Sequence, residues 1–167
     1  MSKRIAKVGL FVALAMIFSY IEAIIPFNFG IPGVKLGVAN IVVVVALYQL
    51  NIPETAGISF VRIFLMGLLF GNIMSLAYSF SGGVLSLAGM IICKRLRLSV
   101  IGVSIVGGVL HNVGQLLAAA FILQSTAITY YFPVLLVSGL VTGFLIGIVS
   151  YRVNKSLNKF AQKDTDK

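Results

Sequence analysis

Residues 132–151 read FPVLLVSGLVTGFLIGIVSY, an unbroken apolar stretch without a charged side chain. A helix of about 20 residues spans roughly 30 Å, which is the thickness of the hydrocarbon core of a bilayer. Five basic residues follow this stretch: Arg152, Lys155, Lys159, Lys163 and Lys167. The stretch therefore predicts a transmembrane helix that ends at Tyr151 on the cytoplasmic side, followed by a basic tail that frays from the membrane surface.

The whole chain shares this composition. Of its 167 residues, 59% are hydrophobic and 10% are charged, and the mean hydropathy is +1.08. Four acidic residues cannot supply the mixed charged surface of a soluble domain, so a water-soluble enzyme is excluded. A single cysteine and a single histidine exclude an intramolecular disulfide and a structural zinc site, and we expect no cofactor.

Five further apolar runs precede residues 132–151. They are Val8–Ile25, Leu36–Leu50, a run from Pro53 to at least Phe70, a run from the Gly71-Asn72 break to Cys93, and Val100–Leu123. A break at Gly71-Asn72 is preferred to one at Ser81-Gly82-Gly83, because a helix beginning at Val84 would be too short to cross a membrane. The sequence thus predicts an all-α integral membrane protein with six transmembrane helices. Residues 1–157 form one domain and residues 158–167 form a basic cytoplasmic tail.

Basic residues flank the apolar runs rather than forming one face. Eleven of the 13 lie in three clusters: Lys3, Arg4 and Lys7; Lys94, Arg95 and Arg97; and the five residues after Tyr151. Cytoplasmic loops carry this excess of Lys and Arg, so both termini are predicted to be cytoplasmic. The net charge of +9 therefore indicates topology and contact with membrane lipid, not nucleic-acid binding.

Small residues recur at spacings of four on two of the predicted helices. Gly139, Gly143 and Gly147 leave one face of the last helix without side chains, so another helix can approach closely. Packing within the chain is the preferred interpretation for this row. On the first helix, Ala15 and Ser19 are candidate residues for docking a separate membrane subunit, with internal packing as an equal alternative.

Ionisable and amide side chains within the apolar runs point to a binding site. Such groups are costly in a membrane and usually face the interior of the bundle. The candidate substrate-binding residues are Lys35, Asn40, Arg62, Asn72, His111, Asn112 and Gln115. Two positive charges, on Lys35 and Arg62, outweigh the single negative charge of Glu22 in this region, which favours an anionic or amphipathic ligand. The alternative is structural: Arg62 bonds helix-end carbonyls, and His111, Asn112 and Gln115 form hydrogen bonds between helices.

Several short motifs carry a family resemblance. They are PGVKLGVAN at 32–40, FGN at 70–72, SGGVLSL at 81–87, KR at 94–95, GVS at 102–104 and HNVGQ at 111–115. From about residue 5 to 155 the chain resembles the bacterial Gx transporter family, also labelled heptaprenyl diphosphate synthase component I.

That family looks like the S components of energy-coupling-factor transporters. The resemblance implies a six-helix bundle in the bacterial cell membrane that captures a small-molecule ligand near the outer face, among the first loop and helices four to six. It also implies a transmembrane coupling subunit with two ATPases as partners.

The synthase label conflicts with the residues present. Prenyl chain elongation needs aspartate-rich motifs to hold Mg²⁺, and the two aspartates, Asp164 and Asp166, lie in the polar tail. The chain is therefore not expected to be an enzyme, and without a Walker A motif it cannot itself use ATP. We expect a substrate-binding subunit of a transporter. The alternative is a non-catalytic membrane scaffold of a prenyl diphosphate synthase or of a quinone- or flavin-linked complex.

Overall fold

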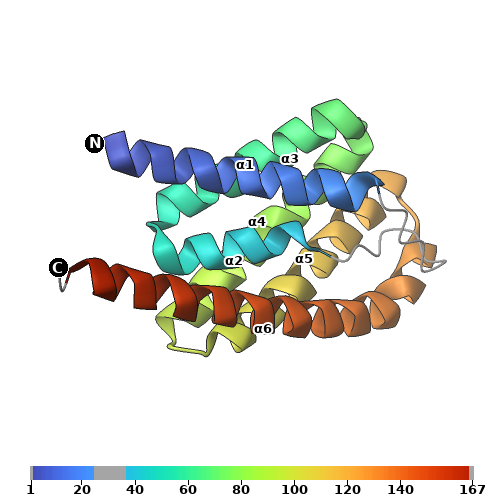
Figure 1. Cartoon of the computed structure of the whole chain (residues 1–167). Helices are drawn as coiled ribbons and strands as arrows, with labels where there is room; N and C mark the ends of the chain where they lie inside the picture. The colour runs from blue at the N-terminus through green and yellow to red at the C-terminus, as the bar shows by residue number, and fades with distance from the viewer. Residues whose placement is uncertain (1, 25–36, 166–167) are drawn as a thin grey trace.

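The computed structural model describes residues 2–24 and 37–165, and these residues form an all-helical bundle (Figure 1). The elements are α1 (Ser2–Ile24), α2 (Ala39–Gln49), α3 (Ile52–Phe70), α4 (Ile73–Arg95), α5 (Val100–Leu123), the short 3₁₀ helix η1 (Thr126–Tyr131) and α6 (Phe132–Thr165). The all-α prediction is confirmed for this part of the chain. The predicted site residue Lys35 lies outside the described residues.

Five helices, α1, α3, α4, α5 and α6, are long and apolar enough to cross a membrane. The second apolar run was expected to span it over Leu36–Leu50, but α2 has only 11 residues. That length corresponds to about 16 Å, roughly half of the hydrocarbon core. A multi-pass membrane protein is therefore supported, and six spans remain a prediction.

The short helix α2 lies between α1 and α6 (Figure 1). Around the rest of the bundle, α1 packs on α3, α3 on α4, α4 on α5 and α5 on α6, and α2 also contacts α3 and α5. Every residue from Val42 to Leu47 is buried, as expected for a helix that is apolar on all sides. Figure 1 shows the start of α1 and the end of α6 at the same end of the bundle, here named the proximal end. The opposite end is named the distal end.

Local capping explains where the helices begin. Pro53 and Glu54 lie in the first turn of α3, and the Glu54 carboxylate accepts a hydrogen bond from the backbone N–H of Asn51. The break at Gly71-Asn72 is also confirmed, because the Asn72 side chain caps α4 by accepting from the backbone N–H of Ser75 at 2.8 Å. The hairpin from α3 to α4 thus turns without a long loop.

The glycine row on α6 packs against α5. A Cβ added to Gly139, Gly143 or Gly147 would lie 2.8–2.9 Å from a backbone Cα atom of α5. Real Cβ atoms do not approach backbone so closely, so the two helices can only be this near because the row carries no side chains. The preferred interpretation, packing within the chain, is confirmed.

The small-residue stripe on α1 also faces inward. Ala15 is fully buried and Ser19 is 8% exposed, and Ala15 packs with Val42 and Ile58 of α2 and α3. Neither side chain is available on the surface, so the structure does not support their assignment to partner docking. Sequence spacing could not decide this, because close packing uses small residues both within and between chains.

The last helix is longer than predicted. It was expected to end at Tyr151 with a fraying tail, but α6 continues to Thr165. The Gln49 side-chain amide donates to the side-chain oxygens of Asn154 and Asn158, both at 3.0 Å, and so ties this extension to the end of α2.

The proximal end is held by further polar contacts between helices. Lys94 Nζ donates to the backbone carbonyl of Leu47 and lies over the Tyr48 ring. Lys7 Nζ donates to the carbonyl of Gln49 at 3.2 Å. These lysines satisfy carbonyls that a helix C-terminus leaves without intrahelical partners.

Candidate functional site

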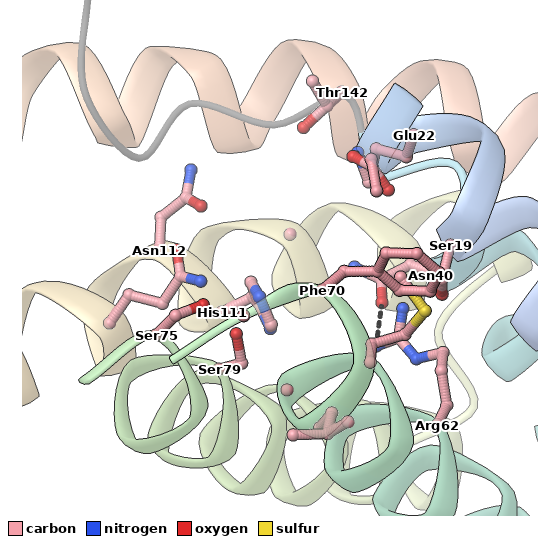
Figure 2. Close-up of a pocket in the computed structure, with 18 of the residues that line it drawn as sticks. Ser19, Glu22, Asn40, Arg62, Phe70, Ser75, Ser79, His111, Asn112 and Thr142 are labelled. Atoms are coloured by element: carbon pink, nitrogen blue, oxygen red, sulfur yellow. Dashed lines mark hydrogen bonds between the residues drawn. The ribbon is translucent and has the colours of Figure 1, made fainter. Parts of the chain in front are cut away.

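A polar cavity of about 160 Å³ lies inside the distal half of the bundle. Because α2 begins only at Ala39, it fills the proximal half of the interior, and the cavity adjoins its N-terminal end. Figure 2 shows side chains from several helices pointing into this space. The polar and charged side chains in the lining are Ser19, Glu22, Asn40, Arg62, Ser75, Ser79, His111, Asn112, Gln115 and Thr142.

Arg62 is the cation of the described lining. Its Nη2 donates to Asn40 Oδ1 at 3.4 Å, a long hydrogen bond (dashed in Figure 2). Its Nε is buried and has no hydrogen-bond partner among the described residues, and the same holds for Ser19 Oγ, which also lines the cavity. An unsatisfied buried polar group costs about 1–3 kcal/mol, so a polar guest in the cavity would relieve this cost.

Glu22 fixes the start of α2. One of its carboxylate oxygens accepts a hydrogen bond from the backbone N–H of Gly37 at 2.5 Å. Gly37 has a φ of +67°, a left-handed conformation that glycine adopts without steric cost. The carboxylate therefore already occupies the position at the α2 N-terminus where an anion would be stabilised.

The polar residues of α5 form the wall opposite α3. Gly82 allows α4 to pack closely against this part of α5. A Cβ on Gly82 would lie 2.7 Å from the carbonyl oxygen of His111 and 2.9 Å from Gln115 Cγ. Asn112 Nδ2 donates to the carbonyl of Leu135 at 2.7 Å and so links α5 to the first turns of α6. Asn112 thus makes a hydrogen bond between helices, as the structural alternative expects, and it also lines the cavity.

Five of the seven predicted site residues line this one cavity: Asn40, Arg62, His111, Asn112 and Gln115. Lys35 lies outside the described residues. Asn72 is not part of the lining; it is exposed and serves as the N-cap of α4. A polar residue beside a predicted helix break is as well suited to capping as to binding, and the binding role of Asn72 stays a prediction.

Sequence reasoning did not assign Glu22, Ser75, Ser79 and Thr142 to the site, and it gave Ser19 another role. A signal was present, since Ser19 and Glu22 are three apart on α1, and Ser75 and Ser79 are four apart on α4. Each pair therefore lies on one helical face. Isolated hydroxyls in apolar helices often bond the backbone, as Thr142 Oγ1 does with the Ser138 carbonyl, so they were poor indicators alone.

The fold and this site define a multi-pass helical membrane protein with a polar cavity in its interior. The chain belongs to the family described as heptaprenyl diphosphate synthase component I, whose sequence pattern matches residues 11–153. All residues of the cavity lining fall within that range. No curated protein and no solved structure matches the chain. The family description names one component of a complex, which implies a partner subunit.

Proposed function

We propose that this protein is the substrate-binding membrane subunit of a bacterial transporter of the energy-coupling-factor type. The observation that carries the proposal is the polar cavity around Arg62, whose Nε has no hydrogen-bond partner among the described residues. A purely structural Arg would be expected to have its donors satisfied, because an unpaired buried donor destabilises the fold.

The charge distribution supports an outward-facing cavity. The three basic clusters predicted to be cytoplasmic, in α1, at the end of α4 and in α6, belong to segments at the proximal end. The cavity adjoins the distal end, which the positive-inside rule then places toward the outside. Both termini are cytoplasmic in this arrangement.

The lining favours a small ligand that accepts hydrogen bonds. Arg62 can bind a carboxylate or another acceptor, while Glu22 is engaged by the N–H of Gly37. The described lining holds one cation, Arg62, and one anion, Glu22, so their formal charges cancel. The preference for an anionic ligand therefore rests on the Arg62 Nε–H group, which has no partner among the described residues. Energy must come from a partner subunit with ATPases.

Native mass spectrometry of the protein purified in mild detergent tests the binding role. The wild type should retain a small molecule, and Arg62→Gln should lose it while remaining folded. Arg4→Gln is the matched control, because Arg4 is exposed and pairs with Glu54 at the proximal end. Equal retention by wild type and Arg62→Gln would refute the proposed site.

Thiol labelling tests the orientation. In a Cys93→Ser background, an impermeant reagent added to intact cells should label Tyr130→Cys, which replaces a residue that is 85% exposed near the distal end. It should not label Lys159→Cys until the membrane is opened. The reverse pattern would invert the proposed topology.

The family description supports a second candidate, a non-catalytic membrane scaffold for a prenyl diphosphate synthase or for a quinone- or flavin-linked complex. The proteins that co-purify distinguish the two. Coupling-factor ATPases support the transporter subunit, whereas a soluble prenyl synthase supports the scaffold.

A further inference from the structure

A second hollow lies on the outside of the bundle, between α3 and α4. It has a volume of about 760 Å³ and is lined only by hydrocarbon side chains, among them Phe64, Leu76, Ala77 and Phe80. Phe64 is 56% exposed and Phe80 is 53% exposed, so this groove faces the surroundings of the bundle. In a membrane those surroundings are lipid chains.

The groove and the polar cavity share a wall that is one side chain thick. Ile63 belongs to both linings. Gly67 lines the cavity, and a Cβ on it would lie 2.6 Å from Cδ1 of Leu76, which lines the groove. The partition at this place therefore consists of the Gly67 backbone and the side chains of Ile63 and Leu76, and rotamer changes of these two side chains can widen the passage beside Gly67.

The two compartments have complementary chemistry. The cavity of about 160 Å³ offers an Arg62 donor that has no partner among the described residues, which suits an acceptor group such as a carboxylate. The adjoining groove offers only apolar contacts. A protein helix about 10 Å wide could cover the groove but could not reach Arg62 through it.

We propose that the ligand is a single-chain amphiphile, with an acceptor head such as a carboxylate against Arg62 and a hydrocarbon chain that passes between Ile63 and Leu76 into the groove. This inference rests on the proposed function, since it names the substrate class of the same cavity. It also gives the ligand a lateral route, between α3 and α4, from the lipid phase.

Tryptophan fluorescence tests the position of the chain, because the protein has no tryptophan. The probe is 9,10-dibromostearate, whose bromines quench nearby indoles, added to nanodiscs of unbrominated phosphatidylcholine. Phe64→Trp places the reporter in the groove. Phe144→Trp on α6 is the matched control, since Phe144 is 48% exposed and lies outside the groove. Phe80→Trp is a second groove reporter should Phe64→Trp not fold.

The expected result is saturable quenching of the groove reporter, at least twofold stronger than that of the control, which excess stearate reverses. Adding Arg62→Gln should reduce it to the level of the control. Equal quenching at both positions, quenching that survives Arg62→Gln, or the same saturable quenching by dibromo-phosphatidylcholine would each overturn the inference, because bulk lipid would then fill the groove.

Retention of the native small molecule separates this inference from the proposed function. If the wild type retains a molecule that Arg62→Gln loses, yet quenching is not specific to the groove, the cavity binds its ligand without the chain and only the inference fails. If no Arg62-dependent molecule is retained and no specific quenching occurs, both fail.

Discussion

The two halves of the bundle interior use polar side chains in opposite ways. In the proximal half, α2 fills the space with apolar side chains, and Lys94, Lys7 and Gln49 make hydrogen bonds between helices around its end. In the distal half, polar side chains surround open space, and Arg62 Nε has no partner in the described part of the chain. The difference supports the proposal that the proximal half maintains the fold and that the distal half binds the ligand.

The largest expected effect is on ligand affinity in the distal half. Arg62→Gln should weaken binding of the retained molecule by about 2–5 kcal/mol, the usual loss when one partner of a desolvated charged contact is removed. The ligand-free protein should melt at or above the wild-type temperature, because the substitution removes an unsatisfied donor. Melting with and without the retained molecule measures both. A lower melting temperature with unchanged affinity would make Arg62 a structural residue and erase the contrast between the halves.

The next effect concerns the contact between α5 and α6, which both halves share. Gly143→Ala should lower the free energy of unfolding by about 1–3 kcal/mol, because its Cβ would lie 2.8 Å from the Cα of Ile105. The matched control is Gly57→Ala in α3, where an added Cβ meets nothing within 4 Å. That control should be neutral or more stable by up to about 1 kcal/mol. Thermal melts in one detergent compare the pair, and equal losses would deny the close packing of α5 on α6.

A smaller effect is expected at the proximal end. Lys94→Met should cost about 1–2 kcal/mol of stability, since it leaves the Leu47 carbonyl without its charged donor. Ligand retention should not change, in contrast to Arg62→Gln. Arg95→Met replaces the exposed neighbouring basic residue and serves as the control. Loss of the ligand in Lys94→Met would show that the two halves are coupled.

The smallest effect is predicted for the ion pair between Arg4 and Glu54. Both groups are solvent-accessible, with side-chain exposures of 61% and 20%, so water and salt screen their attraction. Arg4→Gln should leave the melting temperature within experimental error at physiological ionic strength. A clear drop would mean that the proximal end depends on this pair as well as on the buried contacts.

Sequence patterns predicted most of the fold because each pattern depends only on residues that are close together in the chain. Apolar runs of span length, the Gly71-Asn72 break and the basic stop after Cys93 place the helices correctly. The length of α2 and the extension of α6 depend on contacts between distant segments, such as that of Gln49 with Asn154. No local pattern carries that information.

The candidate site was predicted in part for a similar reason. Ionisable groups inside a membrane avoid lipid, so Arg62 and His111 could be expected in the interior. Which faces of α1 and α4 turn toward them depends on how the helices rotate against each other. Ser19 shows the limit, because a small polar residue fits a helix contact and a cavity wall equally well.

The length of α6 has a mechanical consequence. A continuous helix of 34 residues is about 51 Å long, so about 20 Å of it extends past a hydrocarbon core of roughly 30 Å. This extension is a continuous helical segment that carries four basic side chains: Arg152, Lys155, Lys159 and Lys163. A tilt of about 10° within the bilayer displaces its tip by on the order of 3 Å, a shift comparable to two residues of helical rise. A tilt of α6 would therefore produce its largest displacement at this tip.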